Sequence, residues 1–257
     1  MTIITLTSDW GLKDHYVGSV KGRILSYLPT ATIIDLSHDI PHFDYYHTAF
    51  LIRNAYVNFP KGTIHIIAVD SEASVKTPHI AVLYDGHYFI CSDNGTMSLI
   101  MDKEPECIIE IEIIQDSDYF SFPARDVFAK AAYILDDSKD IHKLGKVKKS
   151  LNTLKHLNPV VKDDIIKGNV IYIDTYENVI TNINKDYIKE NIKGKNLNVV
   201  LPDEEMIPLS KSYKDVEEGE ILAFFNTSGF LEIAINKGNA AGLYGIKPGD
   251  IIKVEIK

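Results

Sequence analysis

The feature that most constrains the fold is a change of pattern near residue 159. Before it, β-rich runs alternate with segments whose apolar residues recur at helical spacing. After it, the chain consists almost entirely of short β-rich runs, separated by turn dipeptides such as Ser228–Gly229 and Pro248–Gly249. The first pattern is typical of an α/β domain, and the second of a compact antiparallel β domain.

In the first part, strand-like and helix-like segments alternate. A hairpin is predicted across the turn pair Asp85–Gly86. The predicted helices cover residues 16–28, 48–57 and 125–135. The predicted strands are 2–7, 32–36, 63–69, 79–84, 87–91 and 107–113. This alternation predicts a largely parallel sheet.

The second part is predicted to consist of strands joined by tight turns. Its predicted strands are 169–174, 179–183, 197–201, 220–226, 230–235 and 250–256. The lysine-rich stretch 143–162 is the predicted connection between the two parts. We therefore expect two domains, at residues 1–158 and 166–257.

Composition excludes several classes of protein. The 257 residues carry a formal net charge of −9, without the basic stripe that binds nucleic acid. No apolar stretch reaches the roughly 18–20 residues that cross a bilayer, and the start of the chain does not resemble a signal peptide. Cys91 and Cys107 lie in apolar runs, so we expect reduced, buried thiols. A cytoplasmic protein that binds neither nucleic acid nor membrane is expected.

Acidic side chains recur just beyond the ends of predicted strands, at Asp9, Asp35, Asp70 and Asp93. In open α/β sheets, ligands bind in the crevice at the carboxyl ends of the strands. A single aspartate there is more often a turn former or a helix cap. Several in one half of the chain favour a pocket for a polar ligand, and binding a ribose diol is one common use of such a carboxylate.

Recognisable metal and cofactor motifs are not found. His38, His42 and His47 are close in sequence, but Pro41 interrupts any helix that would join the first two. Neither an H-E-x-x-H element nor paired cysteines support a zinc site. Glycine-rich loops for nicotinamide or nucleoside triphosphates and a G-x-S-x-G elbow are missing as well. We therefore expect no metal and no cofactor.

Ordered sequence blocks run through nearly the whole chain. They are T-S-D-W-G at 7–11, I-D-L-S-H-D-I-P at 34–41, F-P-K-G-T at 59–63, S-D-N-G at 92–95, A-R-D-V-F-A at 124–129, N-V-I-T-N at 178–182, G-F-L-E-I-A at 229–234 and G-N-A-A at 238–241. Together these blocks resemble the S-adenosylmethionine hydroxide adenosyltransferases, a family related to the fluorinase and chlorinase halogenases.

The resemblance implies an α/β nucleoside-binding domain and a smaller antiparallel, β-barrel-like C-terminal domain, assembled as a homotrimer with active sites at subunit interfaces. Asp9 matches the family's ribose carboxylate, Asp174 and Asn178 its methionine-end ligands, and Asn239–Ala240 its adenine contacts. The substrate-binding residues implied in this way are Asp9, Trp10, Asn94, Phe122, Arg125, Asp126, Asp174, Asn178, Asn226, Ser228, Asn239 and Ala240.

The implied reaction is hydrolysis of S-adenosylmethionine to adenosine and L-methionine, by substitution at the ribose 5′ carbon. Methionine leaves as a neutral thioether, so the leaving group needs no acid. The site must instead hold the nucleophile in line and exclude bulk water. Because hydroxide is scarce at pH 7, a base or an electrostatic trap for it is expected.

The chain departs from the Asp–Arg–His set of the family's hydrolases. Asp70 is kept, but Thr77 stands at the arginine position and Pro123 at the histidine position. Ala124 stands where the fluorinase carries its halide-binding hydroxyl, which disfavours a fluorinase.

Alternative explanations of this departure remain open. In the first, the loop rebuilds the charged set around Asp70 with Lys76 and His79, together with Glu72. In the second, these side chains are ordinary loop and strand-end residues in a non-catalytic protein that binds S-adenosylmethionine or adenosine. A third alternative is a family member that uses another nucleophile. On the leading hypothesis of hydrolysis, the predicted catalytic residues are Asp70, Lys76 and His79.

Overall fold

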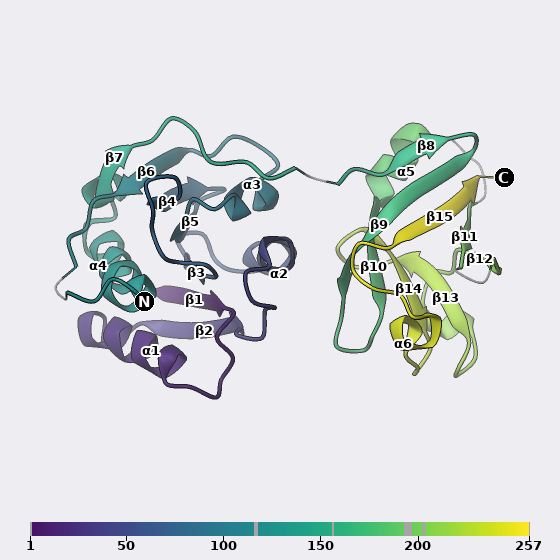
Figure 1. The fold of residues 1–257 in the computed structure, drawn as a ribbon, viewed down its shortest axis with the longest axis horizontal. Coiled ribbons are helices and arrows are strands. Elements are labelled where there is room, and N and C mark those ends of the chain that lie inside the picture. Colours follow the sequence, from purple (N-terminus) through teal and green to yellow (C-terminus); the bar gives the residue numbers. More distant parts are fainter. Residues whose placement is uncertain (1, 116–117, 156, 193–196, 202–203, 257) are drawn as a thin grey trace. The chain divides into compact units, whose positions relative to one another are not determined.

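The structure of the chain is a computed structural model of two compact units, Met1–Lys155 and His156–Lys257 (Figure 1). It describes residues 2–115, 118–155, 157–192, 197–201 and 204–256. Residue 156, inside the predicted connection 143–162, lies outside the described residues. Part of this stretch is strand, β7 (Gly145–Val147) and β8 (Val160–Lys162), so it is not a plain linker.

Unit 1 is built on a seven-stranded mixed sheet. The strand order is β2 (Thr32–Ser37), β1 (Ile3–Ser8), β3 (Ile64–Ala68), β5 (His87–Ser92), β4 (His79–Tyr84), β6 (Cys107–Ile111) and β7. The first four strands in this order run parallel to one another, which confirms the predicted parallel arrangement for this half of the sheet. The hairpin at Asp85–Gly86 makes β4 antiparallel to β5, and the β4–β6 and β6–β7 pairs are antiparallel as well.

Helices pack against the sheet of unit 1 in two separate hydrophobic clusters. One cluster joins α1 (Tyr16–Tyr27) and α4 (Ala129–Ser138) to the sheet. The other joins α2 (Tyr45–Tyr56) and α3 (Thr96–Ile100) to it (Figure 1). A strand covered on both faces is buried along its whole length, which explains why β3 is a continuous apolar run in the sequence.

Two helices begin differently from the predictions. α2 begins at Tyr45 rather than at residue 48, because the Asp44 side chain accepts a hydrogen bond from the His47 backbone N–H at 2.9 Å and caps the helix. The helix predicted over 125–135 begins with a π-helical turn, η1 (Ala124–Phe128), before α4 follows. Both differences lie next to residues of the candidate site.

Two expectations drawn from composition can be compared with the fold. Cys91 is buried, as predicted, but Cys107 is only partly buried, so the prediction of a buried thiol is wrong there. Cys107 is the first residue of β6, ahead of the buried pair Ile108 and Ile109, and its side chain is less covered than theirs. Within the described ranges, no helix is long and apolar enough to cross a membrane.

Unit 2 is an antiparallel sheet of eight strands that nearly closes on itself. Leu209, just after β12, forms a bridge with Ala223 of β13, so the two ends of the strand order meet in a barrel-like arrangement. Two short helices, α5 (Lys185–Asn191) and α6 (Ala240–Tyr244), interrupt a region that was predicted as strands and turns. The strand order is β12 (Met206–Pro208), β11 (Leu197–Val200), β15 (Ile251–Ile256), β9 (Ile165–Ile173), β10 (Val179–Asn184), β14 (Phe230–Ile235) and β13 (Ile221–Phe225), with β8 paired to β9.

The carboxyl ends of β1 and β3 lie side by side in unit 1. Ser8 pairs with Ala68 in the parallel register, so both strands end at the same edge of the sheet. Asp9 follows β1 directly, and Asp70 follows β3 after Val69. The two aspartates therefore leave the sheet at neighbouring points, as expected for a site at the ends of parallel strands.

Candidate active site

Asp9 is the first residue after β1 and is 6% exposed. Its Oδ2 accepts a hydrogen bond from the backbone N–H of Phe43 at 3.1 Å. His38 holds the same turn, because its carbonyl accepts a hydrogen bond from the Gly11 N–H at 2.7 Å and its Nδ1 lies 2.6 Å from Ser8 Oγ. The Asp9 carboxylate is thus fixed by the local backbone.

Asp70 has a partner that the sequence did not reveal. The hydroxyl of Tyr45, the first residue of α2, donates a hydrogen bond to Asp70 Oδ2. Burial, this hydrogen bond and the carboxylates of Asp70 and Asp9 raise the pKa of Tyr45 to about 12, so the phenol keeps its proton at neutral pH. A sequence signal for its position was available at Asp44, since the capping preference of aspartate marks where α2 begins, but the predicted helix began at residue 48.

The backbone around Asp70 is held on both sides. Asp70 has φ of 47°, a left-handed conformation that is uncommon outside glycine and concentrates at functional sites. The carbonyl of Val69 accepts a hydrogen bond from Asn94 Nδ2 at 3.2 Å. The carbonyl of Ser71 accepts one from His79 Nε2 at 2.9 Å. Asn94 and His79 therefore stabilise the turn that presents the Asp70 carboxylate.

The other two predicted acidic residues have partners of their own. Asp35 lies within β2 rather than beyond its end; it accepts a hydrogen bond from Lys21 Nζ at 2.6 Å, and its Oδ1 lies 3.2 Å from His38 Nε2. Asp93 Oδ1 accepts one from the Asn152 N–H at 2.9 Å, and Lys148 Nζ lies 3.6 Å from its other oxygen. Burial raises the pKa of Asp93. The candidate site at this edge therefore holds two of the predicted carboxylates, rather than all four.

Aromatic side chains gather beside the turn that carries Asp9. The ring centroids of Trp10 and Phe122 are 5.4 Å apart at an interplanar angle of 73°, and those of Tyr16 and Phe122 are also 5.4 Å apart, at 83°. The guanidinium carbon of Arg125 lies 5.2 Å from the Phe122 ring centroid. These edge-to-face contacts make a firm apolar wall of the kind that lines small-molecule sites.

Arg125 and Asp126 pair with each other in the π-helical turn η1. Arg125 Nε donates to Asp126 Oδ1 and Nη2 donates to Oδ2, both at 2.7 Å, in the bidentate geometry that suits a guanidinium. Asp126 is 8% exposed, and hydrogen bonding to it raises the pKa of Arg125. π-Helical turns are frequent at functional sites. Here the turn holds a neutralised ion pair next to the aromatic wall.

In unit 2, Asp174 and Asn178 close the turn between β9 and β10. Asp174 Oδ1 accepts hydrogen bonds from the N–H groups of Tyr176 at 2.9 Å and Asn178 at 2.8 Å. Asn178 Nδ2 donates to Asp174 Oδ2 and to the hydroxyl of Tyr213, both at 3.0 Å. The two predicted residues are therefore together, and Tyr213 joins them.

The polar network continues from Tyr213 into the sheet. The Tyr213 hydroxyl donates to Glu232 Oε1 at 2.7 Å, and Asn226 Nδ2 donates to Oε2 of the same carboxylate at 3.1 Å. Asn226 Oδ1 in turn accepts a hydrogen bond from the Ser228 N–H at 3.0 Å. Burial and the Glu232 carboxylate raise the pKa of Tyr213. Neither Glu232 nor Tyr213 was predicted as a site residue from the sequence.

Asn239 caps α6, because its side chain accepts a hydrogen bond from the Gly242 N–H at 2.5 Å. Ala240 and Ala241 are buried, and the Ala241 N–H donates to the carbonyl of Glu177 at 3.0 Å. The predicted Asn239–Ala240 pair is therefore attached to the same turn as Asp174 and Asn178. Unit 2 thus has its own polar cluster.

Two family profiles match this chain. The profile described as "SAM hydroxide adenosyltransferase N-terminal domain" matches residues 4–145, and that described as "SAM hydroxide adenosyltransferase C-terminal domain" matches residues 168–253. The chain belongs to this family. The resemblance found in the ordered sequence blocks is thereby confirmed.

Relatives within the SAM hydroxide adenosyltransferase family cover the whole chain. The (R)-S-adenosyl-L-methionine hydrolase of Methanocaldococcus jannaschii is 32% identical over 99% of this chain and 96% of its own length. A fluorinase of Nocardia brasiliensis is 25% identical over 99% of this chain and 97% of its own. A crystal structure of an uncharacterized conserved protein from Thermotoga maritima matches with a TM-score of 0.89 and 32% identity, covering 98% of this chain and 99% of that one.

The loop at 71–79 contains Thr77, which the sequence resemblance sets at the arginine position of the family's hydrolases, and the predicted catalytic residues Lys76 and His79. The Thr77 hydroxyl lies 2.7 Å from that of Ser74, and the carbonyl of exposed Lys76 accepts a hydrogen bond from Asn152 Nδ2 at 2.7 Å. His79 is half-buried, and burial lowers its pKa. In the described part of the chain, neither Lys76 nor His79 makes a hydrogen bond or ion pair with Asp70.

Apolar groups surround Pro123, the residue that the sequence resemblance sets at the histidine position of the family's hydrolases. Pro123 and Ala124 are buried at the start of η1, and Ala124 belongs to the hydrophobic cluster that joins α4 to the sheet. Across the described ranges, no group of three or more His, Cys, Asp or Glu side chains could hold a metal ion. Tyr45 is thus the group that the structure pairs with Asp70.

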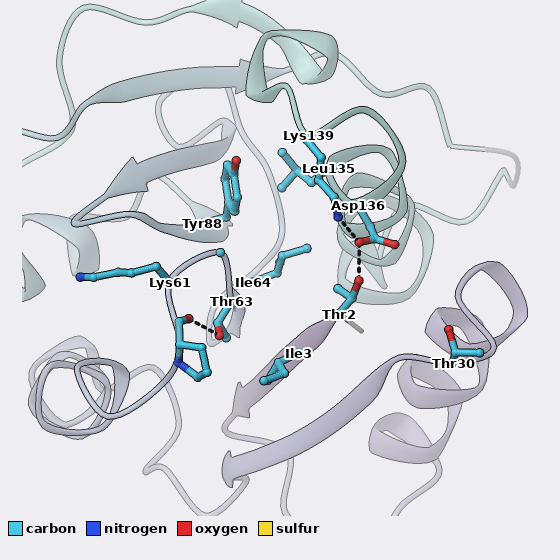
Figure 2. A pocket seen from close by; sticks show the side chains of 12 residues that line it. Thr2, Ile3, Thr30, Lys61, Thr63, Ile64, Tyr88, Leu135, Asp136 and Lys139 are labelled. Atoms are coloured by element: carbon cyan, nitrogen blue, oxygen red, sulfur yellow. Dashed lines mark hydrogen bonds and ion pairs between the residues drawn. The ribbon is translucent and has the colours of Figure 1, made fainter.

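A cavity of about 440 Å³ lies at the other end of the parallel strands, where β1 and β3 begin (Figure 2). Of its charged lining groups, Lys139 Nζ pairs with Asp136, whose carboxylate also accepts a hydrogen bond from the Thr2 hydroxyl, and Lys61 pairs with Asp85. It is lined by none of the predicted site residues. We therefore take the carboxyl edge of β1 and β3, rather than this cavity, as the candidate active site.

Proposed function

We propose that this chain hydrolyses S-adenosylmethionine to adenosine and L-methionine. The observation that carries the proposal is the position of Asp9 and Asp70 at the ends of adjacent parallel strands, with the Tyr45 phenol hydrogen-bonded to Asp70 and influenced electrostatically by Asp9. The family and the names of its curated relatives supply the substrate and reaction.

In the proposed reaction, the oxygen of a water molecule attacks the ribose 5′ carbon while the bond from that carbon to sulfur breaks. The sulfur keeps the bonding electron pair, and methionine leaves as a neutral thioether. Asp70 accepts the proton that the attacking water loses. No oxidant, reductant or cofactor takes part in this balance.

The proposed binding roles divide between the two units. In unit 1, which we propose as the nucleoside-binding domain at 1–158, Asp9 accepts hydrogen bonds from the ribose diol and the aromatic wall lies against the nucleoside. In unit 2, the proposed 166–257 domain, the polar cluster takes the methionine and adenine ends. The unit 1 binding residues proposed are Asp9, Trp10, Asn94, Phe122, Arg125 and Asp126, and those of unit 2 are Asp174, Asn178, Asn226, Ser228, Asn239 and Ala240.

The proposal is tested by incubating the purified protein with S-adenosylmethionine and separating the products by chromatography. The name of the Methanocaldococcus jannaschii relative specifies (R)-S-adenosyl-L-methionine, so the two epimers of S-adenosylmethionine at sulfur are supplied separately. Adenosine and methionine in equal amounts are the expected products, with the (R) epimer preferred. Absence of both products with either epimer would refute hydrolysis.

A second candidate function is binding of S-adenosylmethionine without turnover. It is favoured by Thr77 and Pro123, which the sequence resemblance sets at the arginine and histidine positions of the family's hydrolases. The Thr77 hydroxyl is hydrogen-bonded to that of Ser74, and Pro123 is buried. Calorimetry run beside the product assay separates the two functions. Binding of either epimer without adenosine formation would support this second candidate.

Alanine variants at Lys76 and His79 test whether either side chain acts together with Asp70 in catalysis. We expect Lys76→Ala to keep kcat within about threefold, because an exposed ammonium is screened by water and interacts weakly with distant groups. His79→Ala should lower kcat by about tenfold or more, since it removes the donor to the Ser71 carbonyl beside Asp70. Product formation measures both variants. A loss of roughly 10²-fold in Lys76→Ala would show instead that Lys76 is a catalytic group.

We also propose a homotrimer, as the resemblance to the family implies. Three copies of 28.9 kDa give a mass of about 87 kDa, as a closed cyclic assembly of identical chains would have. Light scattering over a dilution series measures this mass directly. A monomer that binds S-adenosylmethionine with undiminished affinity would contradict the proposed assembly.

A further inference from the structure

The Tyr45 hydroxyl reaches Asp70 from a rigid element. Tyr45 is the first residue of α2, and the preceding Asp44 caps that helix through the His47 N–H at 2.9 Å. The Asp44 carbonyl also accepts a hydrogen bond from the Thr48 hydroxyl at 2.6 Å. The position of the phenol is therefore set by a capped helix, and does not depend on the exposed loop that follows Asp70.

The Asp70 carboxylate is held from the opposite side by its own backbone. Hydrogen bonds to the carbonyls of Val69 and Ser71 keep Asp70 in its left-handed conformation. With Oδ2 bonded to Tyr45, Oδ1 has no hydrogen bond among the residues described. One carboxylate oxygen is thus used for orientation, and the other is available to a ligand or a water molecule.

We propose that Tyr45 is a positioning residue that takes over the orienting role of the missing arginine and histidine. By donating to Oδ2, it directs Oδ1 of Asp70 toward the water that attacks the ribose 5′ carbon. This inference rests on the proposed hydrolysis, and assigns to Tyr45 a role that the sequence motifs do not contain.

A neutral phenol suits this role for an electrostatic reason. The charged groups that face its hydroxyl are Asp70, after β3, and Asp9, after β1. Two carboxylates near one donor keep its proton in place across the neutral range. The hydrogen bond stabilises the charged form of Asp70 without adding a positive charge beside the sulfonium substrate, which an arginine would add.

The test removes the hydroxyl and keeps the ring, in Tyr45→Phe. The matched control is Tyr46→Phe, the next residue, whose hydroxyl donates to the Lys155 carbonyl at 3.1 Å and whose side chain is exposed. We expect Tyr45→Phe to lower kcat by roughly 10-fold to 150-fold with KM within about threefold, the range for a hydrogen bond to a charged group. The control should match the wild type in both constants.

The split between kcat and KM separates positioning from a general loss of structure. A disordered site would bind substrate more weakly and raise KM, whereas a misoriented Asp70 carboxylate lowers kcat alone. Equal thermal unfolding of the two variants shows that both fold. Wild-type kcat in Tyr45→Phe would overturn the inference.

A spectroscopic measurement tests the pair without turnover. In protein labelled with ¹³C at the tyrosine ring carbon that bears oxygen, the Tyr45 resonance is identified by its loss in Tyr45→Phe. It should shift in Asp70→Ala at pH 7, because the phenol loses its charged acceptor. An unmoved resonance with an active wild type would overturn the role of Tyr45 alone. A shifted resonance with no adenosine from the wild type would instead overturn the proposed hydrolysis, and with it this role in catalysis.

Discussion

Replacing Asp70 by asparagine should reduce kcat by about 10²-fold to 10⁴-fold, the range for loss of a general base. The amide cannot accept the proton of the attacking water, while it keeps the shape of the carboxylate and tolerates the left-handed backbone at φ of 47°. Adenosine is neutral and does not react, so its affinity, measured by calorimetry, should change by less than about threefold in this variant.

Asp85→Asn is the matched control for this prediction. Asp85 also has a left-handed backbone, with φ of 50°, but it lies in the β4–β5 hairpin and pairs with Lys61 at 2.8 Å. The same chemical change there should leave both kcat and adenosine affinity at wild-type values. Wild-type turnover in Asp70→Asn would remove Asp70 from the catalytic step.

Replacing Asp9 by asparagine should weaken adenosine binding by about 1.5–3 kcal/mol, or roughly 10-fold to 150-fold. A carboxylate can accept hydrogen bonds from both ribose hydroxyls, whereas an amide offers one acceptor and turns a donor toward the second hydroxyl. Asp9 Oδ2 also accepts the Phe43 N–H, which the amide oxygen of asparagine can still do. The fold should therefore be retained.

Calorimetry with adenosine and with 2′,3′-dideoxyadenosine makes this test specific to the ribose. The wild type should lose affinity for the dideoxy compound, and Asp9→Asn should bind the two compounds about equally. Asp85→Asn again serves as the control, and should discriminate as the wild type does. Unchanged adenosine affinity in Asp9→Asn would exclude Asp9 from the ribose site.

Local signals in the sequence predicted much of the fold. The turn pair Asp85–Gly86 placed the β4–β5 hairpin, and β4 and β14 have the predicted bounds. Short elements such as α3 and α6 were missed, because five residues are too few to show helical periodicity. The start of α2 was misplaced because the capping signal at Asp44 was not weighed.

The sequence could predict those residues of the candidate site that are acidic and follow directly after a strand. Asp9 and Asp70 are such residues, and the parallel register of β1 and β3 brings them to one edge of the sheet. The Tyr45–Asp70 hydrogen bond was not predictable, because it joins residues far apart in sequence through the packing of α2 beside the sheet. The same reason applies to Tyr213 and Glu232 in unit 2, whose contact depends on how the antiparallel sheet closes.

The origin of the oxygen in the product tests the central claim most directly. The purified chain is incubated with S-adenosylmethionine in water enriched in ¹⁸O, and the adenosine is analysed by mass spectrometry. Attack of water at the ribose 5′ carbon predicts adenosine that carries the label in its 5′ hydroxyl group, at the enrichment of the solvent. Adenosine without the label, or labelled water that yields no adenosine at all, would contradict hydrolysis at that carbon.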